Sequence, residues 1–61
     1  MSTSQLVDAI RKWTEKNGRG PIFDDLHRFF GGSDDTLVEE LDKALKANII
    51  GQHDDRTYYV V

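Results

Sequence analysis

The sequence contains no cysteine, one proline and no long apolar run. Without cysteine, neither a disulfide nor a thiolate metal site can stabilise the chain. Its uninterrupted apolar segments are only a few residues long, whereas a membrane-spanning helix needs about 20. No signal-peptide pattern opens the chain. We therefore expect an intracellular, soluble protein, cytoplasmic or nuclear and without a membrane partner, or a domain excised from a larger chain.

Positive charge is also in the minority, with eight lysines and arginines against eleven acidic residues. The formal net charge of −3 disfavours broad electrostatic capture of nucleic acid or anionic lipid. The 61 residues leave room for a single domain, and a chain this short buries only about 60% of the surface that its unfolded form exposes. Stability must therefore come from a small apolar core, to which the six aromatic residues can contribute much of the area.

The first expected helix begins near Ser4 and ends at Asn17-Gly18, where either residue can adopt a left-handed cap conformation. Ser2 and Gln5 have the spacing of a capping box. The apolar face of this helix repeats at helical spacing and consists of Leu6, Ile10 and Trp13.

A short second helix is expected to open at Asp24 or Asp25, after a turn that contains Pro21, and to stop at Gly31-Gly32. Because a proline favours extended geometry in the residue before it, the segment 22–23 could add a short extra strand. The residues of this helix that should face inward are Leu26, Phe29 and Phe30.

A third helix should be capped by Ser33 and end near Asn48. Its apolar residues recur at a period of 3.6 and are Leu37, Val38, Leu41, Ala44 and Leu45. After it, two β-rich runs flank the turn-forming segment 53–56 and predict a hairpin. A lone hairpin is marginal in water, so this one should close over the helices. The predicted core comprises Leu6, Ile10, Trp13, Leu26, Phe29, Leu37, Leu41, Leu45 and Ile50.

The order of three helices and a hairpin resembles the winged-helix fold over nearly the whole chain. The tail "LDKALKANIIGQHDDRTYYVV" carries the likeness, with Asn48 where such domains usually have glycine. The segments "KNGRGPIFDDL" and "ALKANIIGQHDD" are similar to the small C-terminal winged helices of replication proteins, including the MCM helicase and the middle subunit of replication protein A. The resemblance implies one α+β winged-helix domain over residues 1–61 and a role in DNA replication. It also implies that Tyr59 and Val61 face the core, which leaves Tyr58 and Val60 outside.

In a winged helix that reads DNA, the third helix usually presents basic or amide side chains to the major groove. Residues 33–47 instead carry five carboxylates and two lysines, so that repulsion by phosphate disfavours this mode. Two explanations stay open. The charges could only stabilise the helix, through its dipole and through the pairs Glu39–Lys43 and Asp42–Lys46, or they could bind a partner.

The favoured hypothesis is a non-catalytic module that binds a protein through the third helix and the wing, at Asp35, Glu39, Asp42 and Tyr58. The partner would supply a basic amphipathic segment with an apolar side chain that packs on the tyrosine. The alternative is weak or non-specific DNA binding dominated by phosphate contacts. Its residues would be Arg11, Lys12, Lys16 and Arg19 on the first helix and its exit, with Arg56 on the wing.

Catalytic and metal chemistry find little support in the sequence. His27 and His53 lie on different expected elements, and no nucleophile–base pair is apparent. Three Asp-Asp doublets fall at helix starts or in a turn, where aspartate bonds backbone groups, and they lack the spacing of a calcium loop. We therefore expect no enzymatic activity, cofactor, metal or small-molecule substrate.

Overall fold

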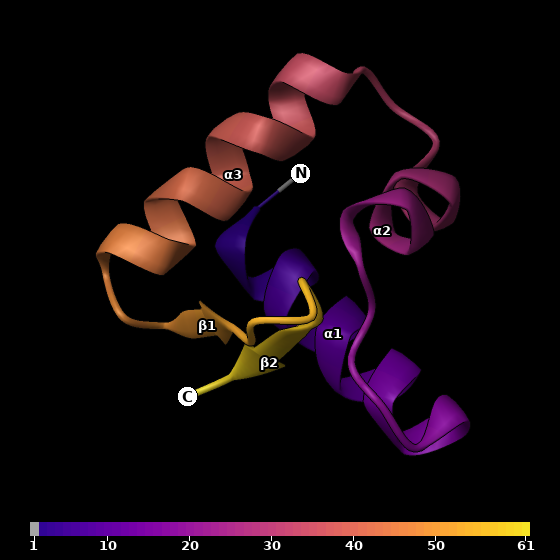
Figure 1. Cartoon of the computed structure of the whole chain (residues 1–61). Helices are drawn as coiled ribbons and strands as arrows, with labels where there is room; N and C mark the ends of the chain where they lie inside the picture. Colours follow the sequence, from indigo (N-terminus) through magenta and orange to yellow (C-terminus); the bar gives the residue numbers. More distant parts are fainter. Residues whose placement is uncertain (1) are drawn as a thin grey trace.

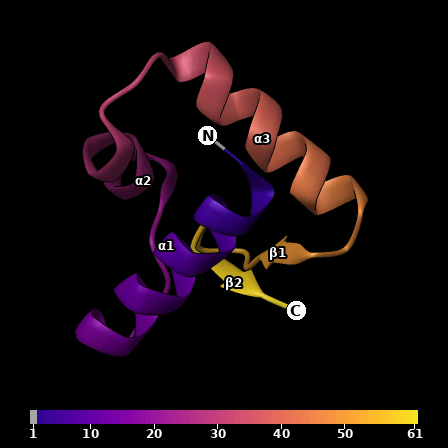
Figure 2. The ribbon, with the colours of Figure 1, turned by 180° about the vertical axis from the view of Figure 1, so that it is seen from behind.

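The computed structural model describes residues 2–61 and has the architecture of a small α+β domain (Figure 1). The helices α1 (Thr3–Asn17), α2 (Phe23–Phe30) and α3 (Asp34–Lys46) precede an antiparallel hairpin of β1 (Ile50–Gln52) and β2 (Tyr58–Val60). The central element is α1, which packs against α2, α3 and β2, as the view from behind also shows (Figure 2). This order confirms the predicted α+β class and is compatible with a winged-helix layout. Within residues 2–61, none of the helices has the length and hydropathy required to traverse a bilayer.

Most helix ends form as their local signals predicted, but α2 begins at Phe23 and not at Asp24 or Asp25. Ser2 Oγ accepts a hydrogen bond from the Gln5 N–H at 3.2 Å, and Gln5 Oε1 accepts one from the Ser2 N–H at 2.9 Å, which confirms the capping box. The Ser33 hydroxyl caps α3. Positive φ angles follow the three helices, at Gly18 (74°), Gly31 (66°) and Asn48 (58°). These residue types adopt the left-handed conformation at low cost, so the local sequence determines where each helix stops.

The predicted extra strand at 22–23 is wrong. Phe23 is already the first residue of α2, and the Asp25 carboxylate accepts a hydrogen bond from the Ile22 N–H at 3.1 Å. The turn before α2 instead makes one backbone hydrogen bond with β2, in which the Tyr58 N–H donates to the Pro21 carbonyl at 2.8 Å. A proline has no N–H to return, and the helix follows directly, so the pairing goes no further.

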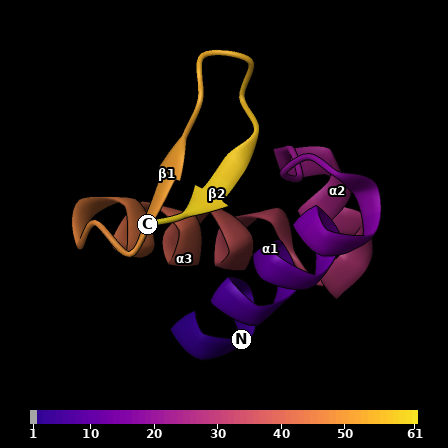
Figure 3. The ribbon, with the colours of Figure 1, turned by 90° about the horizontal axis from the view of Figure 1, so that it is seen from below.

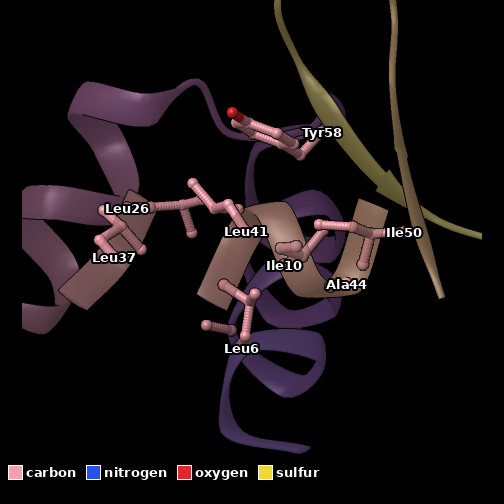
Figure 4. Close-up of a cluster of buried hydrophobic side chains, with 9 residues drawn as sticks. Leu6, Ile10, Leu26, Leu37, Leu41, Ala44, Ile50 and Tyr58 are labelled. Atoms are coloured by element: carbon pink, nitrogen blue, oxygen red, sulfur yellow. The ribbon is translucent and has the colours of Figure 1, made fainter. Parts of the chain in front are cut away.

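The core lies between α1, α3 and the hairpin, with one leucine contributed by α2 (Figure 4). Six of the nine predicted core residues are buried: Leu6, Ile10, Leu26, Leu37, Leu41 and Ile50. Ala9, Ala44 and Tyr58 complete the cluster, and Leu45 is partly buried against it. The remaining two, Trp13 and Phe29, lie outside this cluster.

Phe29 is 57% exposed, although it was predicted to belong to the core. Successive helix residues are about 100° apart, so Phe23, Leu26 and Phe30 share one face of α2 and Phe29 falls to its side. Trp13 has the correct phase, but it lies past the buried part of α1 and is only half-buried. The apolar period alone therefore overestimated how far the core extends.

The predicted phase of the hairpin is also wrong. Tyr58 is 6% exposed, whereas Tyr59 is 39% and Val61 75% exposed. The register pairs Ile50 with Val60, so the side of the sheet that holds buried Ile50 also holds Tyr58 and the partly buried Val60. Burial raises the pKa of the Tyr58 phenol, because the phenolate would lose its hydration.

The hairpin turn projects away from α1 and α3 (Figure 3). One Asp55 carboxylate oxygen accepts hydrogen bonds from the Thr57 hydroxyl at 2.7 Å and from the Thr57 N–H at 3.1 Å. These bonds satisfy a threonine that is only 8% exposed. They also lower the pKa of Asp55 below the ordinary value of 3.8, with the hydroxyl contact as the largest cause.

We expect the turn to loosen in acid. A depressed folded-state pKa gives stability that is present above the unfolded-state pKa and is lost as pH falls through the folded-state value. The Thr57 amide, followed by NMR from neutral pH downwards, should therefore shift below pH 3.8. In Asp55→Ala the amide should already be displaced at neutral pH and should not titrate. Asp54→Ala, in the same turn, should keep the titration. An unchanged Thr57 titration in Asp55→Ala would contradict the assignment.

Candidate functional site

The exposed side of α3 carries the predicted acidic residues around an apolar side chain. Asp35, Glu39 and Asp42 are exposed, and Val38 is 52% exposed among them. Residues three or four positions apart are neighbours on a helix surface, so Asp35, Val38 and Asp42 form a stripe with Glu39 beside it. These four residues are called the α3 face below.

The ion pairs along α3 only partly follow the prediction. Lys46 Nζ lies 2.9 Å from Asp42 Oδ2, as expected, but Lys43 Nζ lies 3.6 Å from Glu40 Oε1. The predicted Glu39–Lys43 pair is therefore replaced by a pair with the less exposed Glu40. Exposed pairs contribute little to stability, so the negative charge of Asp42 is only partly offset.

Glu39 is the carboxylate that local helix stability does not explain. Among the residues that the structure describes, neither Asp35 nor Glu39 has an ion-pair partner. Asp35 lies in the first turn of α3, where the helix dipole favours a negative charge. Glu39 lies beyond that turn, and the dipole effect decays within it. The face thus holds one carboxylate beyond the first turn that has no ion-pair partner in the described structure, and an exposed valine next to it.

Tyr58, predicted as the apolar anchor of this surface, does not lie on it. Its side chain belongs to the core, where the figure places it above Leu41 and Ile10 (Figure 4). The apolar side chain that is exposed beside the carboxylates is Val38 of α3. Leu37, Leu41 and Ala44 are the buried residues of α3, and this narrow core face leaves Val38 to one side.

The five basic residues predicted for DNA are exposed, and they do not all line the same hollow. Arg11 lines a hollow between α1 and β2, whereas Lys12 and Lys16 line a second hollow between α1 and α2. Arg56 lines a third hollow between α2 and the hairpin, together with two carboxylates. Arg19 lies in the turn after α1.

Polar groups near the start of α3 bond to one another. His27 Nε2 lies 2.7 Å from Asp34 Oδ1, and the Ser33 hydroxyl accepts from the Thr36 N–H at 3.3 Å. Within residues 2–61, no hydrogen bond joins His27 to a hydroxyl group, and no three metal-ligating side chains gather. The expectation of no catalysis and no metal stays a prediction.

Comparison with protein-family models, with curated proteins and with solved structures found no match to this chain. The winged-helix resemblance and any functional assignment therefore depend on the residues and geometry described above.

Proposed function

We propose that the chain is a winged-helix domain that acts as a non-catalytic interaction module and binds a protein partner through the α3 face. The observation that carries the proposal is the exposed pair of Val38 and Glu39, an apolar side chain beside a carboxylate that has no ion-pair partner in the described structure. The order of the elements supports the winged-helix class. The similarity of the segments "KNGRGPIFDDL" and "ALKANIIGQHDD" to replication proteins supports a role associated with DNA replication.

The partner complementary to this face is a basic amphipathic segment. An apolar side chain of the partner would cover Val38. Burial of the exposed half of this valine would contribute about 1 kcal/mol to the free energy of binding. The partner's lysines or arginines would meet Asp35 and Glu39, and such rim charges mainly accelerate and select the encounter. The face is small, so the binding should be weak and reversible. The wing is not part of this surface, because the residue that linked it, Tyr58, is buried.

DNA binding, the alternative, finds less support in the geometry. The outer side of α3 is the side that a groove-reading winged helix would use, and here phosphates would meet its carboxylates. The cations that could contact phosphate are divided among separate hollows. A steep loss of DNA affinity with salt would be the signature of this alternative.

Charge reversal on the α3 face should weaken binding of a basic partner. The probe is a synthetic amphipathic helical peptide of leucine, lysine and alanine, compared with a scrambled peptide of the same composition. In NMR titrations, the amphipathic peptide should shift amides of residues 34–46 selectively. Glu39→Lys should slow association about tenfold at low salt and reduce its salt dependence. Val38→Ala should chiefly accelerate dissociation.

The matched control is Glu15→Lys, which makes the same change in net charge on the exposed side of α1. It should retain most of the affinity. Equal losses in the two variants would mean that net charge alone drives binding, and shifts confined to α1 would place the site elsewhere. A short duplex DNA serves as the competing probe. Salt-sensitive shifts at Lys12 and Lys16 with this duplex, and none with the peptide, would favour the DNA alternative.

A further inference from the structure

A second surface lies where α1, α2 and the start of α3 meet. It is a hollow of about 490 Å³, which adjoins a smaller hollow of about 230 Å³ between α1 and α2. Lys12 and Phe29 line both hollows, so the two form one depression along α1, called the α1–α2 groove below.

The groove exposes a large aromatic side chain. Phe29 is more than half exposed, and the edge-to-face packing of its ring with Phe30 (centroids 5.2 Å apart, planes at 86°) holds it in place. The nearly fully buried Ala9 and Leu37 form part of the wall of the larger hollow. A concave surface with an apolar lining and a rigid exposed ring is typical of an interaction site rather than of a solvated helix face.

The polar groups at one end of the groove are unpaired donors. Lys12 and Lys16, one turn apart on α1, line the smaller hollow with Trp13 and have no ion-pair partner in the described part of the chain. The indole N–H of Trp13 is buried and lacks a hydrogen-bond acceptor within residues 2–61. Because the two lysines are exposed and the indole nitrogen is covered, a ligand that complements this end must supply negative charge.

The other end of the groove carries Gln5 and Asp8. A negatively charged ligand would be repelled by Asp8 and attracted by the two lysines, so the charges also favour one orientation along α1. The exposed ring of Phe29 lies between these two ends, since it lines both hollows.

We propose that the α1–α2 groove binds an acidic amphipathic helix of a partner protein. The apolar side chains of that helix pack on Phe29 and enter the larger hollow, and its carboxylates pair with Lys12 and Lys16. This is the helix-in-groove mode of recognition, in which one apolar stripe is buried and the flanking charges set the orientation. The site is independent of the α3 face.

Single-stranded nucleic acid fits the groove less well. It would need a line of cations that follows the backbone and several free aromatic faces for stacking. The groove offers two lysines and one largely exposed ring, whose packing partner Phe30 is itself only partly exposed.

The single tryptophan of the chain makes the test direct, because Trp13 lines the groove. The probe is a synthetic amphipathic peptide of glutamate, leucine and alanine without tryptophan, compared with its scrambled form. The amphipathic peptide should change the Trp13 emission saturably, and the scrambled peptide should not. Phe29→Ala should weaken binding about tenfold or more, as expected for an interface anchor. Lys12→Glu should weaken it strongly at low salt, with less effect at high salt.

Two variants control for general effects. Val61→Ala removes another exposed apolar side chain, and Lys46→Glu makes the same change in net charge on α3. Both should bind the peptide as the unchanged chain does. Glu39→Lys disables the α3 face and should leave the Trp13 response in place, so that failure of one surface is distinguishable from failure of the other.

Three results would overturn the proposal. The first is a Trp13 emission that does not respond to the peptide, or responds equally in Phe29→Ala. The second is displacement of the peptide by a short oligothymidine with tighter binding, which would make the groove a nucleic-acid site. The third is concentration-dependent self-association in sedimentation that Phe29→Ala abolishes, which would make a second copy of the chain the occupant.

Discussion

Gly20→Ala is expected to unfold much of the protein at ambient temperature. A Cβ at Gly20 would overlap the Tyr58 carbonyl oxygen and lie 3.1 Å from its carbonyl carbon. These are backbone atoms of β2, so no side-chain rotation can relieve the overlap. Overpacking of this kind costs about 1–3 kcal/mol, and moving β2 away also breaks the Tyr58–Pro21 hydrogen bond, worth about 1 kcal/mol. A core this small rarely supplies more than about 3–5 kcal/mol.

The matched control is Gly32→Ala. A Cβ at Gly32 meets no atom within 4 Å, and the residue does not have a left-handed φ. Alanine there should be neutral or stabilising by up to about 1 kcal/mol, because it restricts the unfolded chain. Urea denaturation followed by circular dichroism compares the two variants. Equal midpoints would disprove the close approach of β2 to the turn before α2.

Leu26→Ala should have the second large effect. Leu26 is the only buried residue of α2 within the described structure, at 1% exposure, and it belongs to the same buried cluster as Leu37 of α3 (Figure 4). Truncating a fully buried leucine costs about 2–5 kcal/mol, because apolar contact is lost and a cavity remains. We expect the helix to detach, with a lower thermal midpoint and accelerated amide exchange over residues 23–30.

Phe29→Ala is the control on the same helix. Its ring is mostly in water, so the cost should stay below about 1 kcal/mol even though more atoms are removed. The comparison separates burial from residue size. If Phe29→Ala destabilised the protein as much as Leu26→Ala, the exposed position of the aromatic ring would be wrong, and the proposed groove would lose its anchor.

The helix ends were predictable because they depend on neighbours in sequence. Ser2 with Gln5, and the glycines at 18 and 31, satisfy helix termini within a few residues of themselves. The orientation of Tyr58 was not predictable in this way. It depends on the pairing of Ile50 with Val60 across a turn and on contact with Pro21. Gly51 was a usable signal, because the Tyr59 ring lies over it on the outer side of the hairpin.

The candidate surfaces were also predictable only in part, since their charged residues were identified but their exposed apolar residues were not. The carboxylates of α3 could be identified from composition, and their exposure is confirmed. Val38 and Phe29 were assigned to apolar faces because a 3.6-residue period does not define how wide the buried stripe is. The width depends on how closely the neighbouring elements approach, which is a property of the whole fold.

The contact between α1 and β2 also constrains the order of events during protein synthesis. The buried side of α1, including Leu6 and Ile10, is covered in part by a strand that the ribosome makes much later. Until then this apolar surface has no complete cover, because the packing of β2 on α1 joins segments from opposite ends of the sequence. A chain that ends before Tyr58 should therefore be unfolded and sensitive to protease, whereas the chain through residue 61 should be protected.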